Sequence, residues 1–139
     1  MESLKTTYRA DIANLENILD FTGKCAEQFG LAEKRKFGLL VAVEEAFVNV
    51  CHYAYPDGEG EVDLICEGDE HSFAVTLKDR GVAFNVLSLP DPDITSGVSE
   101  RKIGGLGIYF IRKLTDDVSY RRENGQNILR MVLTTPKGS

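Results

Sequence analysis

The stretch EVDLICEGDEHSFAVTLKD, residues 61–79, indicates the fold most directly because a strand-like period of two appears there. Apolar residues stand at every second position of two runs: Val62, Leu64 and Cys66, then Phe73, Val75 and Leu77. This alternation is typical of strands with one buried face, and Gly68-Asp69 between the runs is a turn signal. The stretch therefore predicts a β-hairpin.

Before the hairpin, apolar residues recur at spacings of three and four, which is typical of amphipathic helices. A first helix is expected from a cap at Asp11 to Gly30, with apolar positions at Ile12, Leu15, Leu19, Ala26 and Phe29. A second is expected from about Ala32 to Pro56-Asp57-Gly58, with apolar positions at Phe37, Leu40, Val41, Val48 and Cys51. Residues 4–9 predict a short edge strand.

After the hairpin, residues 80–105 show little periodicity, and a segment of this length is typical of a lid or of disorder. A third helix is expected at about Leu106–Leu114. Two strands, 118–122 and 127–133, flank the turn signal Asn124-Gly125-Gln126. The resulting order, β-α-α-β-β-loop-α-β-β, predicts a two-layer α/β sandwich with a largely antiparallel sheet.

The length and charge of the chain limit its function. The 139 residues predict one domain, 1–139, and the net charge of −6 argues against nucleic acid or an anionic membrane as the main partner. No apolar run approaches the ~20 residues of a membrane span, and residues 1–10 lack the apolar core of a signal peptide. We therefore expect a cytoplasmic protein, whose Cys25, Cys51 and Cys66 are buried thiols.

Polar residues interrupt the second predicted helix at Glu44, Glu45 and Asn49. At about 100° per residue, Glu45 and Asn49 share a face, whereas Glu44 and Asn49 lie about 140° apart. A carboxylate can accept a proton from an attacking hydroxyl group, and an amide oxygen is a neutral ligand for Mg²⁺. The plainer alternative is a solvated glutamate and an asparagine that bonds its own helix.

Asp79 ends the second strand of the hairpin and has the same parity as the apolar positions before it. Its carboxylate therefore points to the apolar face, where it needs a hydrogen-bond donor such as the amino group of adenine. Gly81 would let a ring approach the backbone closely. The alternative is an aspartate that bonds its own turn.

Gly104-Gly105-Leu106-Gly107 opens the third predicted helix. Free backbone N–H groups at a helix start, without bulky side chains, suit phosphate. Arg101 and Lys102 precede this motif and could reach a γ-phosphate. The alternative is a flexible junction between loop and helix.

Three motifs thus occur in order: E-x-x-x-N at 45–49, D-x-G-x-x-F at 79–84 and G-G-L-G at 104–107. Together they resemble the N, G1 and G2 boxes of the GHKL superfamily of ATP-binding domains, the Bergerat fold. The stretches 43–49, 54–55 and 104–114 further resemble the anti-sigma-factor serine kinase branch. The resemblance covers nearly the whole chain and implies a mostly antiparallel, mixed sheet with helices on one face.

The resemblance also implies roles by position. Glu45 would be the general base, Asn49 would hold Mg²⁺, and Asp79 would bond adenine. The implied ATP-binding residues are Asn49, Asp79, Gly81, Phe84, Arg101, Gly104, Gly105, Leu106, Gly107 and Asn127. Asn127 stands near the place where the superfamily often has a threonine beside the adenine-binding aspartate. Tyr53 departs from the branch, which usually has histidine before Ala-Tyr.

The resemblance implies an ATP-dependent protein serine/threonine kinase that acts as an anti-sigma regulatory factor, with ATP and Mg²⁺ as cofactors. Such a kinase phosphorylates a small anti-sigma-factor antagonist and holds a sigma factor, often as a homodimer. The second hypothesis is an ATP-sensing partner-switch module that transfers no phosphate. Glu45 favours the kinase, because a pure binding protein needs no base, whereas Tyr53 favours the binding module.

Overall fold

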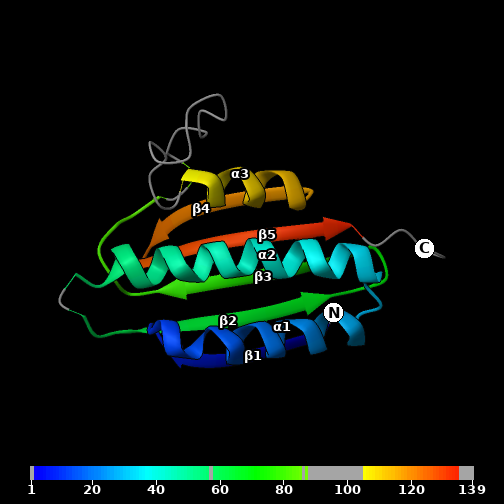
Figure 1. Cartoon of the computed structure of the whole chain (residues 1–139), viewed down its shortest axis with the longest axis horizontal. Helices are drawn as coiled ribbons and strands as arrows, with labels where there is room; N and C mark the ends of the chain where they lie inside the picture. Colours follow the sequence, from blue (N-terminus) through cyan, green and yellow to red (C-terminus); the bar gives the residue numbers. More distant parts are fainter. Residues whose placement is uncertain (1, 57, 86, 88–104, 135–139) are drawn as a thin grey trace.

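Five strands form one sheet in the order β1-β2-β3-β5-β4, and every pairing among the described strands is antiparallel (Figure 1). The computed structural model describes residues 2–56, 58–85, 87 and 105–134. The strands are β1 (Glu2–Arg9), β2 (Glu61–Gly68), β3 (Ser72–Asp79), β4 (Asp117–Glu123) and β5 (Gln126–Thr134). The predicted antiparallel sandwich is confirmed, but the expected mixed character is wrong for these strands, since none of them pairs in parallel.

The helices all cover one face of this sheet, with α2 between α1 and α3 (Figure 1). They are α1 (Leu15–Gln28), α2 (Glu33–Asn49) and α3 (Gly105–Leu114). A 3-10 turn, η1 (Ile12–Asn14), precedes α1, and a π-helical turn, η2 (Val50–Ala54), extends α2. The sequence predicts the three helices but not the π-turn, because no simple residue pattern marks an i to i+5 bond.

The buried face of α2 differs from the expected one. Its buried residues are Gly38, Leu39, Ala42, Val43, Ala46, Phe47 and Asn49. The expected position Phe37 is 71% exposed, and Leu40 and Val41 are half-buried. The prediction was wrong because α2 carries apolar residues around most of its circumference, so periodicity alone leaves its orientation open.

The first helix needs a similar correction. Asp11 caps the 3-10 turn, where its carboxylate accepts from the Ala13 N–H at 3.0 Å, and not α1 itself. Ile12, expected in the apolar stripe, is 46% exposed in this turn. The buried positions of α1 are Ile18, Thr22, Cys25 and Ala26.

Both predicted hairpins are present. β2 and β3 pair antiparallel across the turn at Asp69, whose carboxylate accepts from the His71 and Ser72 N–H groups at 2.8 and 3.0 Å. At the second hairpin, Asn124 and Gly125 both have positive φ, 53° and 77°, as a two-residue turn between twisted strands requires.

On the helix-covered face, β3 and β5 contribute four consecutive facing pairs. From one end to the other these are Phe73–Leu133, Val75–Met131, Leu77–Leu129 and Asp79–Asn127. All eight residues are buried, at 8% exposure or less. The row is therefore apolar for three pairs and polar at the fourth.

The stretch Glu33–Ala54, formed by α2 and η2, is long and apolar enough to span a membrane by length and composition alone. Its mean hydropathy is 1.2, and 44% of the window is buried inside the fold. The sequence expectation rested on uninterrupted apolar runs and did not single out this helix. Its packing on the sheet accounts for much of its apolar character.

All three cysteines are free. Cys25 and Cys66 are buried, as expected, but Cys51 is only half-buried. The expectation of three buried thiols was therefore wrong for Cys51, which lies in the π-turn.

Candidate functional site

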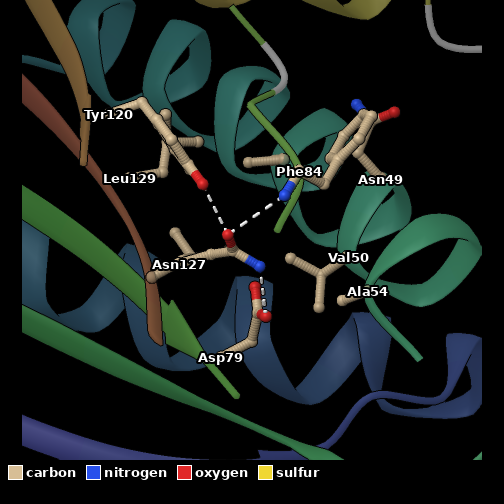
Figure 2. A pocket seen from close by; sticks show the side chains of 10 residues that line it. Asn49, Val50, Ala54, Asp79, Phe84, Tyr120, Asn127 and Leu129 are labelled. Carbon is tan, nitrogen blue, oxygen red and sulfur yellow. Dashed lines mark hydrogen bonds between the residues drawn. The ribbon is translucent and has the colours of Figure 1, made fainter. Parts of the chain in front are cut away.

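A small pocket opens where the polar pair of the β3–β5 row meets the end of α2 (Figure 2). Its lining residues are Ala46, Asn49, Val50, Ala54, Leu77, Asp79, Phe84, Tyr120, Asn127 and Leu129. Four of the predicted site residues thus meet here: Asn49, Asp79, Phe84 and Asn127. The six others were not predicted, although strand parity with Val118 would have placed Tyr120 on this face.

Asp79 is 5% exposed at the end of β3, as its parity predicts. Its Oδ1 accepts hydrogen bonds from the Gly81 N–H at 2.9 Å and from Asn127 Nδ2 at 2.8 Å. Within the described part of the chain, no hydrogen bond reaches Oδ2. The aspartate therefore does bond its own turn, the alternative weighed above, and still keeps one oxygen for a ligand.

Burial raises the pKa of Asp79 above its ordinary value of 3.8, because desolvation disfavours the charged form. The hydrogen bonds from Asn127 and Gly81 and the positive charge of Arg122 oppose this shift. A donor that approached Oδ2 would likewise favour the ionised form.

Asn127 is the centre of the polar network. Its Nδ2 donates to Asp79 Oδ1 and to the Val82 carbonyl, both at 2.8 Å. Its Oδ1 accepts from the Phe84 N–H at 3.1 Å and from the Tyr120 hydroxyl at 2.6 Å. Figure 2 shows the Asn127 amide between Asp79 and Tyr120.

Gly81 lies directly against η2. A Cβ atom at this position would stand 2.0 Å from the Ala54 carbonyl oxygen, so no side chain fits. The Val82 N–H donates to the same carbonyl at 2.8 Å, and Arg122 donates to the Gly81 carbonyl at 2.8 Å. Glycine is therefore required for close contact with the protein's own helix end, whereas the sequence predicts the close approach of a ligand ring at this position.

Asn49 is 3% exposed near the end of α2. Its Nδ2 donates to the Glu45 carbonyl at 2.8 Å, so the amide does bond its own helix. Its Oδ1, however, is buried without any hydrogen-bond partner in the described structure. An orphaned buried acceptor costs free energy of about 1–3 kcal/mol, which a ligand at this atom would recover.

Glu45 is half-buried one turn before Asn49. Desolvation raises the pKa of its carboxyl group, and the negative charge of Glu44 adds to the effect. Among the described residues, those that line the pocket do not include Glu45. It therefore lies outside this pocket, on the helix turn that precedes Asn49.

Phe84 stacks on Tyr53, with ring centroids 4.7 Å apart and planes 21° apart. Tyr53 is 39% exposed, so this aromatic pair lies at the surface beside the pocket. The cavity has a volume of about 30 Å³, which is room for one or two water molecules. A purine can enter only if a lining side chain moves. Two aromatic residues belong to that lining, Phe84 and Tyr120, and Tyr120 is bonded to Asn127 through its hydroxyl group.

The glycine-rich motif is described only in part. The α3 backbone begins at Gly105, within one residue of the predicted start. Arg101, Lys102 and Gly104 lie outside the described residues, as does most of the segment 80–105, for which the sequence predicts a lid or disorder. The side chain of Leu106 is not described. The predicted phosphate-binding role of 104–107 therefore stays a prediction.

The donor set fits the cofactors that the motifs imply. The orphaned Asn49 oxygen is a neutral, hard ligand of the kind Mg²⁺ accepts. The free oxygen of Asp79 can only accept when ionised, so it fits an N–H donor such as an exocyclic amino group. Both atoms belong to residues of one pocket.

Comparisons with known proteins show the family to which the chain belongs. The family model of the histidine kinase-like ATPase domain matches residues 8–133. Serine-protein kinase RsbW of Bacillus mycoides (strain KBAB4) is 29% identical over 108 residues, which cover 75% of this chain and 68% of that protein. The same kinase of Bacillus cereus (strain AH820) is 30% identical with equal coverage.

A solved structure shares the fold. The crystal structure of the RsbU and RsbW domains of Rv1364c from Mycobacterium tuberculosis matches 99% of this chain with a TM-score of 0.63 and 14% identity. The chain spans 34% of that longer one. At this identity the match describes the backbone architecture alone.

Proposed function

Because the chain belongs to the histidine kinase-like ATPase domain family, we propose that it is an ATP-dependent protein serine/threonine kinase and an anti-sigma regulatory factor. Its protein substrate is a small anti-sigma-factor antagonist, and its second partner is a sigma factor. One observation carries the proposal. Among the described residues, the buried Asn49 oxygen has no hydrogen-bond partner, and its residue lines the same pocket as Asp79, whose Oδ2 also receives no hydrogen bond from them.

The adenine ring occupies the pocket in this proposal. Asp79 Oδ2 accepts from the 6-amino group, while Oδ1 stays bonded to Gly81 and Asn127. Leu77, Leu129 and Val50 supply the apolar walls that such a ring needs. The base displaces Phe84 from part of the cavity, since about 30 Å³ is too little for a purine.

The triphosphate extends towards the start of α3. Asn49 Oδ1 would hold Mg²⁺ there, and when bound the ion would neutralise phosphate charge. Backbone N–H groups of 104–107 would hold phosphate oxygens, and Arg101 would lie nearby. These last assignments rest on the sequence motif and on the α3 start at Gly105.

Glu45 acts as the general base. Burial raises the pKa of its carboxyl group towards neutral pH. The carboxylate is therefore a better proton acceptor, and it remains ionised at any pH above that pKa. It takes the proton of the attacking serine or threonine hydroxyl as the oxygen bonds to the γ-phosphorus. The bond between that phosphorus and the β–γ bridging oxygen breaks, and ADP leaves. The rest of catalysis is positioning, as in other phosphoryl transfers.

The second candidate is the partner-switch module without phosphotransfer. The Tyr53–Phe84 stack beside a water-sized cavity favours it, because a protein that closes this pocket with its own aromatic pair could use nucleotide as a signal. The expected homodimer and cytoplasmic location belong to both candidates and are predictions.

The deciding experiment measures phosphoserine or phosphothreonine formation on the genomically adjacent antagonist, with ATP and Mg²⁺. Glu45→Gln keeps the size of the side chain but removes the proton acceptor, so transfer should slow by ~10²–10⁴-fold. Glu44→Gln is the matched control and should stay within a few-fold of wild type. ATP affinity should be unchanged in both.

Two results would overturn parts of the proposal. Wild-type transfer rates in Glu45→Gln would remove the base assignment. A wild-type protein that binds ATP and an antagonist but transfers no phosphate would replace the kinase with the binding module.

A further inference from the structure

We propose that Asn127 is a positioning residue that acts on the nucleotide through Asp79 and never contacts the base. This inference rests on the proposed function, because it concerns how the same site recognises adenine. It changes the role that the sequence resemblance implies for Asn127, which is direct ATP binding.

Asn127 has no hydrogen-bonding capacity left for a ligand. A primary amide has two N–H donors and one oxygen with two lone pairs. The two donors reach Asp79 Oδ1 and the Val82 carbonyl, both at 2.8 Å. The oxygen receives the Phe84 N–H at 3.1 Å and the Tyr120 hydroxyl at 2.6 Å. At 5% exposure, no position remains for a ligand.

The four partners of Asn127 also determine which way its amide faces. Asp79 and the Val82 carbonyl can only accept, and the Phe84 N–H can only donate. A flipped amide would oppose oxygen to oxygen at Asp79 and N–H to N–H at Phe84. The amide therefore presents a donor to Asp79 in one orientation only.

The hydrogen bonds to Asp79 determine which of its oxygens a ligand can meet. Asp79 Oδ1 has two donors, Asn127 Nδ2 and the Gly81 N–H, so its lone pairs are committed. The carboxylate plane is thereby held, and Oδ2 is the oxygen that remains for a base. Asn127 thus fixes the orientation of a carboxylate that could otherwise rotate, and Oδ2 points in a defined direction.

The same amide holds the segment after β3. Val82 and Phe84 stand on either side of Ala83, and both bond Asn127 through their backbones. Phe84 itself lines the pocket. A threonine, common at this place in the superfamily, has one hydroxyl group and can donate only once. It could not hold Asp79 and the Val82 carbonyl at the same time.

The test is a double-mutant cycle on ATP binding, measured by calorimetry with Asn127→Ala, Asp79→Ala and the double variant. Asn127→Ala should lower ATP affinity by ~10-fold, because the Asp79 carboxylate is no longer held in one orientation. This is the scale of one charge-assisted hydrogen bond. In the Asp79→Ala background the same change should cost less than ~2-fold, because its effect passes through Asp79. Thermal melts establish that each variant is folded.

A second measurement uses purine riboside triphosphate, which lacks the 6-amino group. Asn127→Ala should leave its affinity within ~2-fold of wild type, because the interaction that Asn127 supports is absent. Tyr120→Phe removes one of the four bonds and should give a smaller loss for ATP and none for the analogue. This graded variant keeps the ring and the strand position.

The outcomes distinguish a failure of the proposed function from a failure of the positioning role of Asn127. A wild-type protein that binds no ATP overturns the proposed function. A wild type that binds ATP, with equal losses for both nucleotides or with additive losses in the cycle, overturns the positioning role and leaves the proposed function standing. A loss of ATP affinity in Asn127→Ala that requires both Asp79 and the 6-amino group supports the positioning role.

Discussion

The two ends of the β3–β5 row on the helix-covered face are built alike but hold different chemistry. Phe73 and Leu133 face each other at one end with no exposed surface, and Asp79 and Asn127 face each other at the other end at 5% exposure. Burial stabilises the apolar pair, whereas burial of a carboxylate costs free energy that its hydrogen bonds only partly offset. The difference teaches that equal burial in one row can serve stability at one end and recognition at the other.

This comparison predicts that the two ends fail differently. A change at the apolar end should lower the free energy of unfolding and spare ligand affinity in the folded protein. A change at the polar end should alter affinity or specificity more than stability.

Phe73→Ala should lower the free energy of unfolding by about 3–5 kcal/mol, because it leaves a cavity under α1, where Phe73 meets Phe29 at a ring-centroid distance of 5.3 Å. Urea unfolding measures this. Phe37→Ala is the control: that ring is 71% exposed, so its loss should change stability by less than about 0.5 kcal/mol. Equal effects of the two changes would contradict the observed orientation of α2.

Gly81→Ala should destabilise the junction between β3 and η2 by about 1–3 kcal/mol or displace the 80–82 backbone, because the added methyl group would overlap the Ala54 carbonyl. The expected signs are a lower melting temperature and weaker ATP binding. Gly23→Ala in α1 is the matched control. Its Cβ meets Leu40 at an ordinary 4.0 Å, and helix propensity predicts a gain of up to about 1 kcal/mol.

Asp79→Asn should reverse the base preference of the pocket. The asparagine oxygen can replace Oδ1 and keep the bonds from Gly81 and Asn127, which leaves an N–H donor where Oδ2 was. ATP affinity should fall by ~10-fold, and inosine triphosphate, with a 6-oxo group, should bind at least as well as ATP. Calorimetry with both nucleotides checks this, and an unchanged preference for ATP would mean that Asp79 does not read the 6-position.

The pH dependence of stability gives a smaller effect at the same residue. Burial raises the pKa of Asp79 above 3.8 in the folded state, so the folded protein binds this proton more tightly than the unfolded chain does. Stability relative to Asp79→Asn should therefore fall as pH rises from about 4 through the raised pKa, and level off above it. Urea unfolding of both proteins between about pH 4 and pH 7 tests the sign, since other groups titrate in both.

The sequence predicts the alternating parts of this molecule well. The strands, the three helices and the parity that puts Asp79 on the covered face all follow from local periodicity and turn residues. The pairing of Asp79 with Asn127 does not, because register between strands separated by a helix depends on tertiary packing. The orientation of α2 fails for the related reason that its apolar residues surround it.

The site shows the same division. Motif order brings Asn49, Asp79, Phe84 and Asn127 to one pocket, as the sequence predicts. The saturation of Asn127, the packing of Gly81 on the protein's own helix end and the stack of Phe84 on Tyr53 are three-dimensional facts without a sequence signal. Each arises because a residue meets a partner that is far away along the chain.

The position of β5 in the sheet has a consequence for biosynthesis. This strand is the last of the described strands in the sequence, yet it lies between β3 and β4, and its Asn127 meets Asp79 from 48 residues further along the chain. A ribosome must therefore release β5 before β3 gains its second neighbour and before the Asp79 carboxylate is oriented. A nascent chain that stops short of residue 126 has neither a closed core nor an adenine acceptor of defined direction, so folding and nucleotide recognition arise in the same late step of synthesis.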